Sequence, residues 1–336
     1  MKKNSRDNLP FPLFIVMVLA AGILFLLWGQ NNSAATVYEL GFLRYRAQAQ
    51  LENLPEWAVT EEEQAALDGE TAKAEAWAAE HTPIQGSFTT DSAAGWFGDG
   101  ALLTLGYRYY DRGTGKTVIL LHGFEGTEED ALRLAPWWWE QGYGVLIPEE
   151  RGYLEPGETN RTPITYGVYE EFDLYDLILA AGLTEDTVLV HGKGAGAAAA
   201  ILLSANESLA GAGLDGIVAE SVYDELGSLQ RHLLKKLFGL GDWFVGRFLR
   251  SRIRSSLGFE PDSVSICAAA ANMRCPVIFI CGSQEVLPGE ARSRAVYDAC
   301  TTQKELLTVP DASYRALWLS EDYCSAVEAF LSRIRN

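Results

Sequence analysis

The chain has 336 residues, of which 48% are hydrophobic and 21% charged, so it is long enough for one large domain or two small ones with a sizeable core. This balance excludes a mainly disordered, collagen-like or multi-span membrane protein. The 45 acidic against 27 basic residues give a net charge of −18, which disfavours nucleic acid as a partner because most of the surface would repel phosphate.

The first distinctive segment runs from Leu9 to Gly29, 21 residues without a charge. As a helix it would cover a hydrocarbon core of about 30 Å. Three basic residues outweigh Asp7 in the preceding tail, residues 1–8, which predicts a cytoplasmic N-terminus and an extracytoplasmic C-terminal domain. We therefore expect a single-pass anchor in the cell membrane that contacts lipid through Leu9 to Gly29.

A cleaved signal peptide is the competing interpretation of this segment. Ser33 and Ala35 have the small side chains that such a cleavage site uses. The apolar region of a signal peptide is usually only about 7–15 residues long, however. We therefore favour the uncleaved anchor.

Residues 30–83 are predicted to form a helical neck between the anchor and the main domain. Thr60 followed by Glu63 forms a capping box, which predicts a helix that runs to about Glu80.

Residues 84–336 show the alternation of an α/β domain with a mostly parallel sheet and helices on both faces. Two extended segments come first, near 85–89 and 102–110. Short apolar runs typical of strands buried on both faces follow at 117–121, 145–147, 187–190, 217–219, 277–280 and 306–309. Helices are expected between them at about 128–141, 168–182, 195–206, 224–256, 289–301 and 321–334.

Three places in this domain can carry chemistry, because ligands bind beyond the carboxyl ends of parallel strands. The first is the loop from His122 to Gly126, whose backbone N–H groups could face a developing oxyanion. The second is the glycine-rich turn from Gly192 to Gly196, between a strand and an alanine-rich helix. The third is the pair of strand ends at Gly282 to Pro288 and Pro310 to Arg315.

The order and spacing of these motifs resemble the α/β-hydrolase superfamily, especially membrane-anchored bacterial serine hydrolases of the serine aminopeptidase-like and acylaminoacyl-peptidase-like groups. The resemblance covers about residues 84–334. It rests on motifs spread along the chain: His122-Gly123, Glu150-Arg151-Gly152, Tyr166-Gly167 with Glu170 and Asp173, Gly258-Phe259, and Cys275-Pro276-Val277 into Cys281-Gly282.

The resemblance implies a catalytic triad whose positions are altered here. The family serine lies at the centre of Gly-x-Ser-x-Gly on a sharp strand-to-helix turn, and this chain has Gly194 there. Glu285 stands at the acid position, and Tyr314 stands where the family has its histidine. The oxyanion-hole positions are Phe124 and Ala195, and Gly192 and Gly196 flank the turn.

These replacements predict the loss of the family's acyl-enzyme chemistry. Glycine offers no nucleophile, and tyrosine, with an ordinary pKa of about 10, is a poor proton acceptor at neutral pH. We therefore expect a catalytically degenerate pseudo-hydrolase that acts in ligand binding or assembly, with a small carboxylate or ester-like molecule as a possible ligand. The sequence does not indicate a protein partner.

An active hydrolase with an unusual set of residues is the alternative. Ser221 and Ser204 lie near the turn, but we expect neither on a strained turn and interpret both as packing or surface residues. His122 and His191 end neighbouring strands and could approach Glu285 around a metal or an activated water. We favour structural roles for these histidines and expect no metal site.

A dinucleotide site is a more remote alternative, because Gly192, Gly194 and Ala197 fit Gly-x-Gly-x-x-Ala after a strand. The acid that ends the next strand, Glu220, lies 28 residues beyond Gly192 rather than about 20. We favour the interpretation that the small residues of this turn let the helix and the sheet pack closely. We expect no cofactor.

The five cysteines indicate neither a disulfide framework nor a zinc site, because they are odd in number and lack close paired spacing. They all lie in the last quarter of the chain, at Cys267, Cys275, Cys281, Cys300 and Cys324.

A basic, amphipathic stretch occupies the place where such hydrolases carry a lid, about residues 222–262. The stretch 229–258 contains seven basic residues and one acidic residue, Asp242, which gives it a net charge of +6. This lid could cover the pocket, pack on the acidic surface of its own domain, or lie against anionic lipid near the anchor.

Overall fold

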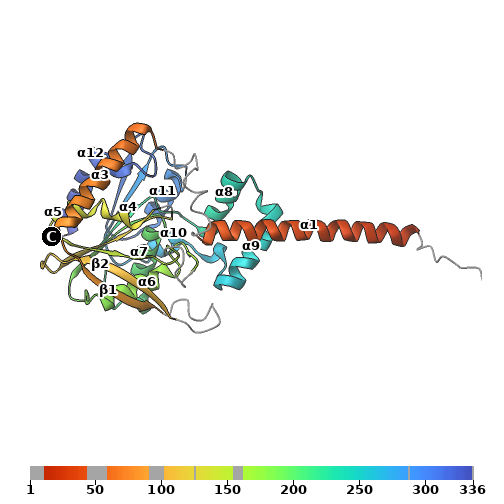
Figure 1. The fold of residues 1–336 in the computed structure, drawn as a ribbon, viewed down its shortest axis with the longest axis horizontal. Helices are drawn as coiled ribbons and strands as arrows, with labels where there is room; N and C mark the ends of the chain where they lie inside the picture. Colours follow the sequence, from red (N-terminus) through yellow and green to blue (C-terminus); the bar gives the residue numbers. More distant parts are fainter. Residues whose placement is uncertain are drawn as a thin grey trace, which may run out of the picture.

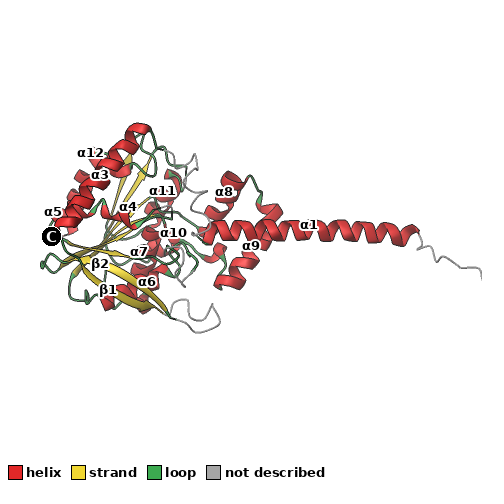
Figure 2. Cartoon of the chain, in the orientation of Figure 1, coloured by secondary structure: helices red, strands yellow, loops and turns green. Residues whose placement is uncertain are grey.

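A computed structural model describes residues 11–43, 59–90, 102–124, 126–153, 162–286 and 288–334. Within these ranges one eight-stranded sheet carries helices on both faces, and a long helix projects from the domain (Figures 1 and 2). The α/β class and the mostly parallel sheet predicted from the sequence are confirmed. The proposed cytoplasmic tail and Leu9 lie outside the described residues.

The sheet has the order β1-β2-β4-β3-β5-β6-β7-β8. The β1–β2 and β2–β4 pairs are antiparallel, and the other five pairs are parallel. Each strand predicted from the sequence is present, with small shifts at the ends. The strands are β1 (Ile84–Thr90), β2 (Leu103–Tyr110), β3 (Lys116–Leu121), β4 (Gly144–Pro148), β5 (Thr187–Lys193), β6 (Gly216–Glu220), β7 (Val277–Gly282) and β8 (Lys304–Val309).

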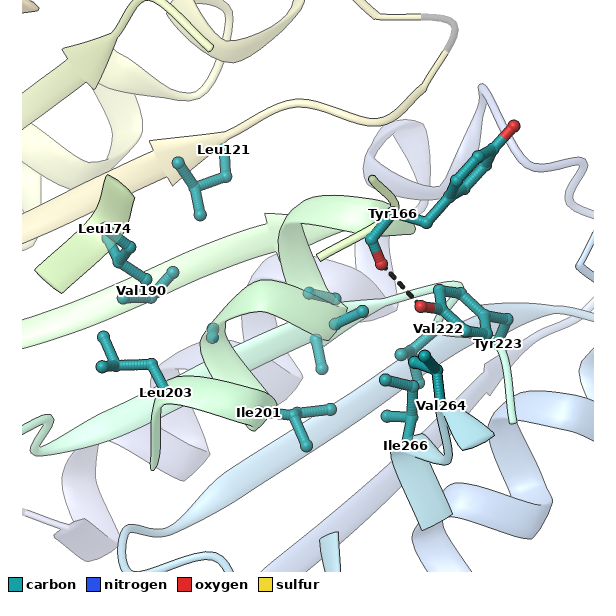
Figure 3. Packing of buried hydrophobic residues seen from close by; sticks show 14 of the residues in the cluster. Leu121, Tyr166, Leu174, Val190, Ile201, Leu203, Val222, Tyr223, Val264 and Ile266 are labelled. Carbon is teal, nitrogen blue, oxygen red and sulfur yellow. Dashed lines mark hydrogen bonds between the residues drawn. The ribbon is translucent and has the colours of Figure 1, made fainter. Parts of the chain in front are cut away.

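Side chains of the central strands alternate between two cores, one on each face of the sheet. In β3, Ile119 belongs to one core and Val118 to the other, and both are fully buried. The larger core packs against α6 (Glu170–Ala180), α7 (Ala195–Ala205) and α11 (Glu290–Ala299) (Figure 3). The other packs against α4 (Glu128–Leu132), α5 (Ala135–Glu140) and α12 (Glu321–Ile334). Burial on both faces explains why these strands are continuous apolar runs.

Two predicted helices are divided in the structure. The stretch 128–141 forms α4 and α5, and the second begins with Pro136 near its amino end, where proline is favoured. The stretch 224–256 forms α8 (Leu226–Phe238) and α9 (Asp242–Leu257), separated at Gly239, whose φ of 63° ends the first helix. The short α10 (Ile266–Ala270) and three 3₁₀ turns, η2 (Glu207–Leu209), η3 (Pro261–Ser263) and η4 (Leu317–Leu319), were not predicted.

The predicted neck helix is α3 (Glu61–Glu80), and its capping box is confirmed. The Thr60 hydroxyl accepts the Glu63 N–H, while the Glu63 carboxylate accepts the Thr60 N–H at 2.7 Å. Leu67 and Ala74 are buried where α3 lies over the α4–α5 side of the domain. This helix is therefore packed on the domain.

The amino-terminal helix α1 (Phe11–Phe42) crosses the predicted boundary between anchor and neck without a break. Its last two turns join the main core through Ala34, Val37, Tyr38 and Phe42, and α1 packs along α9. Residues 34–42 of the predicted neck are therefore helical and packed against the core of the domain. Within the described part of the chain, no helix combines the length and apolar character that a membrane crossing requires.

Candidate functional site

The turn between β5 and α7 bends sharply at Gly194, which has φ 52° and ψ −105°. Its N–H donates to the Glu220 carbonyl at 2.8 Å, which fixes the turn to the neighbouring strand. A Cβ on Gly192 would lie 2.5 Å from the Gly196 carbonyl carbon, and a Cβ on Gly196 would lie 2.6 Å from the Leu121 Cβ. The flanking glycines thus allow the helix to approach the sheet, as expected for close packing.

Tyr314 occupies the space beside Gly194 where a longer side chain would lie. A Cβ built on Gly194 would be 2.7 Å from the Tyr314 hydroxyl oxygen. The Lys193 ammonium lies 4.2 Å from the centre of the Tyr314 ring, an attractive cation–π arrangement. Since Tyr314 is buried, the hydroxyl cannot move aside freely, so the two unusual residues predicted from the sequence fit each other sterically.

A small cavity, partly open to solvent, lies over this turn. It brings together four of the predicted site residues: Phe124, Gly194, Ala195 and Tyr314. Its remaining walls come from Tyr166, Ser221, Tyr223, Leu229, Leu233 and Pro288. Because Leu229 and Leu233 belong to α8, the lid forms part of the cavity wall.

The wall residues Phe124 and Tyr166 connect this cavity to the rest of the molecule. Phe124 stacks on Tyr166 with ring centroids 5.3 Å apart, and its carbonyl accepts the Tyr153 hydroxyl at 2.9 Å. Tyr166 has a positive φ of 58°, and its hydroxyl donates to the Gly41 carbonyl of α1 at 2.6 Å. The end of α1 is therefore attached directly to a cavity wall.

Glu285 lies close to the cavity but engages Ser221 and the backbone. Its Oε1 accepts the Ser221 hydroxyl at 2.5 Å and the Gly282 N–H at 2.8 Å. Burial raises the pKa of Glu285 to about 7, although these hydrogen bonds oppose the shift. Its Oε2 is buried and makes no hydrogen bond within the described residues.

Ser221 differs from its prediction, because its backbone is strained, with φ 47°, a region that non-glycine residues rarely adopt. It is fully buried, and its N–H donates to the Ile280 carbonyl at 2.8 Å. The sequence predicts a packing or surface residue here and no strained turn, and no glycine near Ser221 signals the strain. Ser204, by contrast, is a packing residue, since its hydroxyl accepts the Arg274 N–H at 3.1 Å.

His122 directly follows β3, and His191 lies inside the neighbouring strand β5, two residues before its end rather than at the end as predicted. Both line a different cavity from Gly194 and Tyr314. His191 Nδ1 accepts the Trp138 indole N–H at 2.9 Å, and its Nε2 lies 2.8 Å from both Glu220 and the Tyr323 hydroxyl. These bonds give His191 the structural role that was favoured.

Two alternatives from the sequence, a metal site and a dinucleotide site, can be compared with the described residues. Among the described residues, no group of three His, Cys, Asp or Glu side chains could hold a metal ion. Glu220, the acid of the dinucleotide hypothesis, is buried. Burial alone would raise its pKa, but the hydrogen bonds from His191 and Tyr323 and the positive charges of His191 and Lys193 together hold the pKa below its usual range. A carboxylate committed to His191 and Tyr323 is not available to a ribose.

Comparison with known proteins identifies the fold. No family model matches the chain, and neither does any curated protein. Among solved structures, an esterase from Pyrococcus furiosus matches 76% of this chain and 92% of its own with 19% identity and a TM-score of 0.55. The chain has the α/β-hydrolase fold.

Two further structures agree with this fold. A protein assigned as a lipase from Acinetobacter baumannii matches 83% of this chain and 98% of its own, with 14% identity and a TM-score of 0.54. A bacterial membrane phospholipase A matches 97% of this chain and 98% of its own, with 13% identity and a TM-score of 0.53. At these identities the likeness concerns the fold, so the chemistry must be argued from the site itself.

Proposed function

We propose that this protein is a membrane-anchored pseudo-hydrolase that binds a small carboxylate or ester-like ligand without cleaving it. The observation that carries the proposal is the pair at the turn: Gly194 has no side chain, and the Tyr314 hydroxyl lies 2.7 Å from where a Cβ would be. A nucleophile at this position is therefore both absent and sterically blocked. The ordinary acyl-enzyme route requires a nucleophile at this position.

The cavity retains features that suit such a ligand. Ala195 is the first residue of α7, so its N–H lies at the positive end of a helix, where an anionic or carbonyl oxygen is stabilised. Phe124 lines the same cavity. The resemblance to the family implies that its backbone N–H is the second hydrogen-bond donor to an oxyanion. The apolar walls from Leu229, Leu233 and Tyr223 would hold the rest of the ligand.

An active hydrolase that uses Ser221 is the second candidate, favoured by its positive φ and its hydrogen bond to Glu285. Two observations count against it. The Ser221 hydroxyl is fully buried, although a carboxylate with a pKa of about 7, such as that of Glu285, is suited to general-base work near neutral pH. No histidine lines this cavity within the described residues.

A fluorophosphonate probe separates the two candidates, because it reacts only with an activated hydroxyl. We expect the full-length protein in mild detergent to remain unlabelled while an ordinary serine hydrolase in the same tube is labelled completely. Intact-mass measurement provides the readout. Stoichiometric labelling that disappears in Ser221→Ala would establish the active-hydrolase alternative and refute the pseudo-hydrolase.

The anchor, in this proposal, is the segment Leu9 to Gly29. Its support in the structure is the exposure of large apolar side chains on α1 before it reaches the domain: Leu19, Ile23, Leu24, Phe25, Leu26 and Trp28 are 58–69% exposed. Such a surface requires an apolar partner. Ala34 lies between the small residues of the alternative cleavage site and is buried against the domain, which favours an uncleaved chain.

An uncleaved anchor predicts that the full-length chain stays in the membrane fraction after high-salt and carbonate washes. With the N-terminus cytoplasmic, external protease should digest the C-terminal domain of intact spheroplasts and spare a tag placed before Lys2. A mature chain beginning near Thr36, found by N-terminal sequencing, would show a cleaved signal instead.

A further inference from the structure

The lid differs in charge from the rest of the molecule. The stretch 229–258 carries a net charge of +6 in a chain whose total is −18. Three of its arginines form ion pairs close to the lid: Arg231 with Asp262, Arg250 with Asp242, and Arg254 with Glu260. The other four basic residues, Lys235, Lys236, Arg247 and Arg252, have no carboxylate within 4.0 Å in the described residues.

The helix α9 has two different faces. Val245, Leu249 and Ile253 recur every four residues, are fully buried, and belong to the core that includes the end of α1. Trp243 and Arg247 lie on the opposite face and are exposed, Trp243 to 85%, the highest value for a large apolar side chain in the described residues. A single exposed tryptophan among basic residues is typical of a surface that lies at a lipid interface.

The position of the lid relative to α1 is fixed by side-chain contacts. The Arg252 guanidinium lies 5.8 Å from the centre of the Tyr38 ring, and Figure 1 shows α8 and α9 at the end of the domain from which α1 projects. Ala34, the first buried residue of α1, lies five residues beyond Gly29, which at 1.5 Å per residue is about 8 Å along the helix.

From these observations we infer that Lys235, Lys236, Trp243 and Arg247, the basic lid face, bind the headgroups of anionic phospholipids. The inference rests on the proposed anchor. If α1 enters the bilayer at Gly29, Tyr38 and the neighbouring Arg252 lie about 14 Å along the helix from the hydrocarbon, next to the headgroup layer, where each basic residue is attracted by anionic lipid. The basic lid face would then hold the cavity wall at Leu229 and Leu233 close to the membrane.

Hydrogen exchange of the full-length chain in nanodiscs tests this inference. Two lipid compositions are compared: phosphatidylcholine alone, and phosphatidylcholine with roughly 30% of the anionic lipid phosphatidylglycerol. Amides of 229–258 should exchange at least about fivefold more slowly on the anionic discs, and the difference should shrink at about 1 M salt, where the screening length is about 3 Å.

The variant Lys235→Glu/Lys236→Glu should abolish the difference between the two lipids. Its matched control, Lys73→Glu/Lys116→Glu, changes the total charge equally but alters α3 and the amino end of β3, away from the lid, and should keep the difference. Equal exchange of the wild-type lid on both discs would overturn the inference and favour a lid packed on its own acidic domain.

Failure of the anchor gives a different result from failure of the lid contact. A chain that is stripped by carbonate yet floats with anionic vesicles, and not with neutral ones, would overturn the anchor and support the lid contact. A chain that resists carbonate but shows no lipid-dependent exchange would support the anchor and overturn the lid contact.

Discussion

The double variant Gly194→Ser/Tyr314→His is expected to hydrolyse a p-nitrophenyl ester, whereas each single substitution should stay at the background rate. Residues of a catalytic triad act as a unit, so a serine without a histidine, or the reverse, gains little. We expect the double variant to exceed either single variant by at least about 100-fold in initial rate. Steady-state absorbance assays with the substrate in excess measure this directly.

The geometry at the turn is the reason for this expectation. Gly194 has φ 52° and ψ −105°, a strained conformation that suits a side chain exposed above the sheet, and replacing Tyr314 removes the hydroxyl that fills this space. Glu285 still offers Oε2, which is buried without a hydrogen bond in the described residues and could accept an imidazole N–H. Ala195 remains at the amino end of α7 to stabilise an oxyanion.

The same contact predicts that the two substitutions are coupled in stability. Gly194→Ser alone introduces a Cβ at a positive φ and against the Tyr314 hydroxyl, and should cost at least about 2 kcal/mol. In the double variant the clash is gone, so the cost should fall about 1 kcal/mol or more below the sum of the single costs. Urea unfolding of all three variants measures this difference.

Gly194→Ala/Tyr314→His is the matched control for both measurements. It makes the same change at Cβ and opens the same space but carries no hydroxyl, so it should share the stability of the double variant and lack its activity. A stable double variant without activity would mean that the cavity no longer holds catalytic geometry. That result would count against ligand binding in the cavity and would favour a function in which the protein interacts with a partner through the lid.

Much of the fold could be predicted from local patterns in the sequence. Strands buried on both faces must be apolar throughout, so runs such as Val277 to Ile280 identify β7, and a capping box identifies the start of α3. The places of Gly194 and Tyr314 in the chain could also be found from the order of the strands, since Gly194 directly follows β5 and Tyr314 lies five residues after β8. Patterns of this kind depend on neighbours in sequence.

The contacts that decide the site depend on neighbours in space, which these patterns do not encode. The Tyr314 hydroxyl lies against Gly194, 120 positions earlier, and the Ser221 hydroxyl meets Glu285 across 64 positions. The docking of Phe42 of α1 beside Tyr166 likewise joins distant segments, with ring centroids 5.3 Å apart. A residue such as Ser221 therefore looks ordinary in the sequence although its backbone is strained.

Asp173→Ala is expected to destabilise the domain by about 3–5 kcal/mol, because it leaves a buried guanidinium without its counter-ion. Arg151 follows β4 and is only 1% exposed, and its Nε and Nη2 both donate to the Asp173 carboxylate on α6. Burial alone would lower the pKa of Arg151, but Asp173 outweighs that and holds the pKa above its usual value. Because an arginine side chain stays protonated in proteins, the charge persists when Asp173 is removed.

The exposed pair of Arg254 and Glu260 provides the control, with an N–O distance of 2.9 Å. Glu260→Ala should cost less than about 1 kcal/mol, since water solvates the arginine that remains. Asp173→Asn, which keeps the shape and a hydrogen-bond acceptor but removes the charge, should fall between the two. Urea unfolding of the three full-length variants in detergent gives the order. Equal small costs for Asp173→Ala and Glu260→Ala would mean that water reaches Arg151, and that the link between the β4 loop and α6 does not depend on this ion pair.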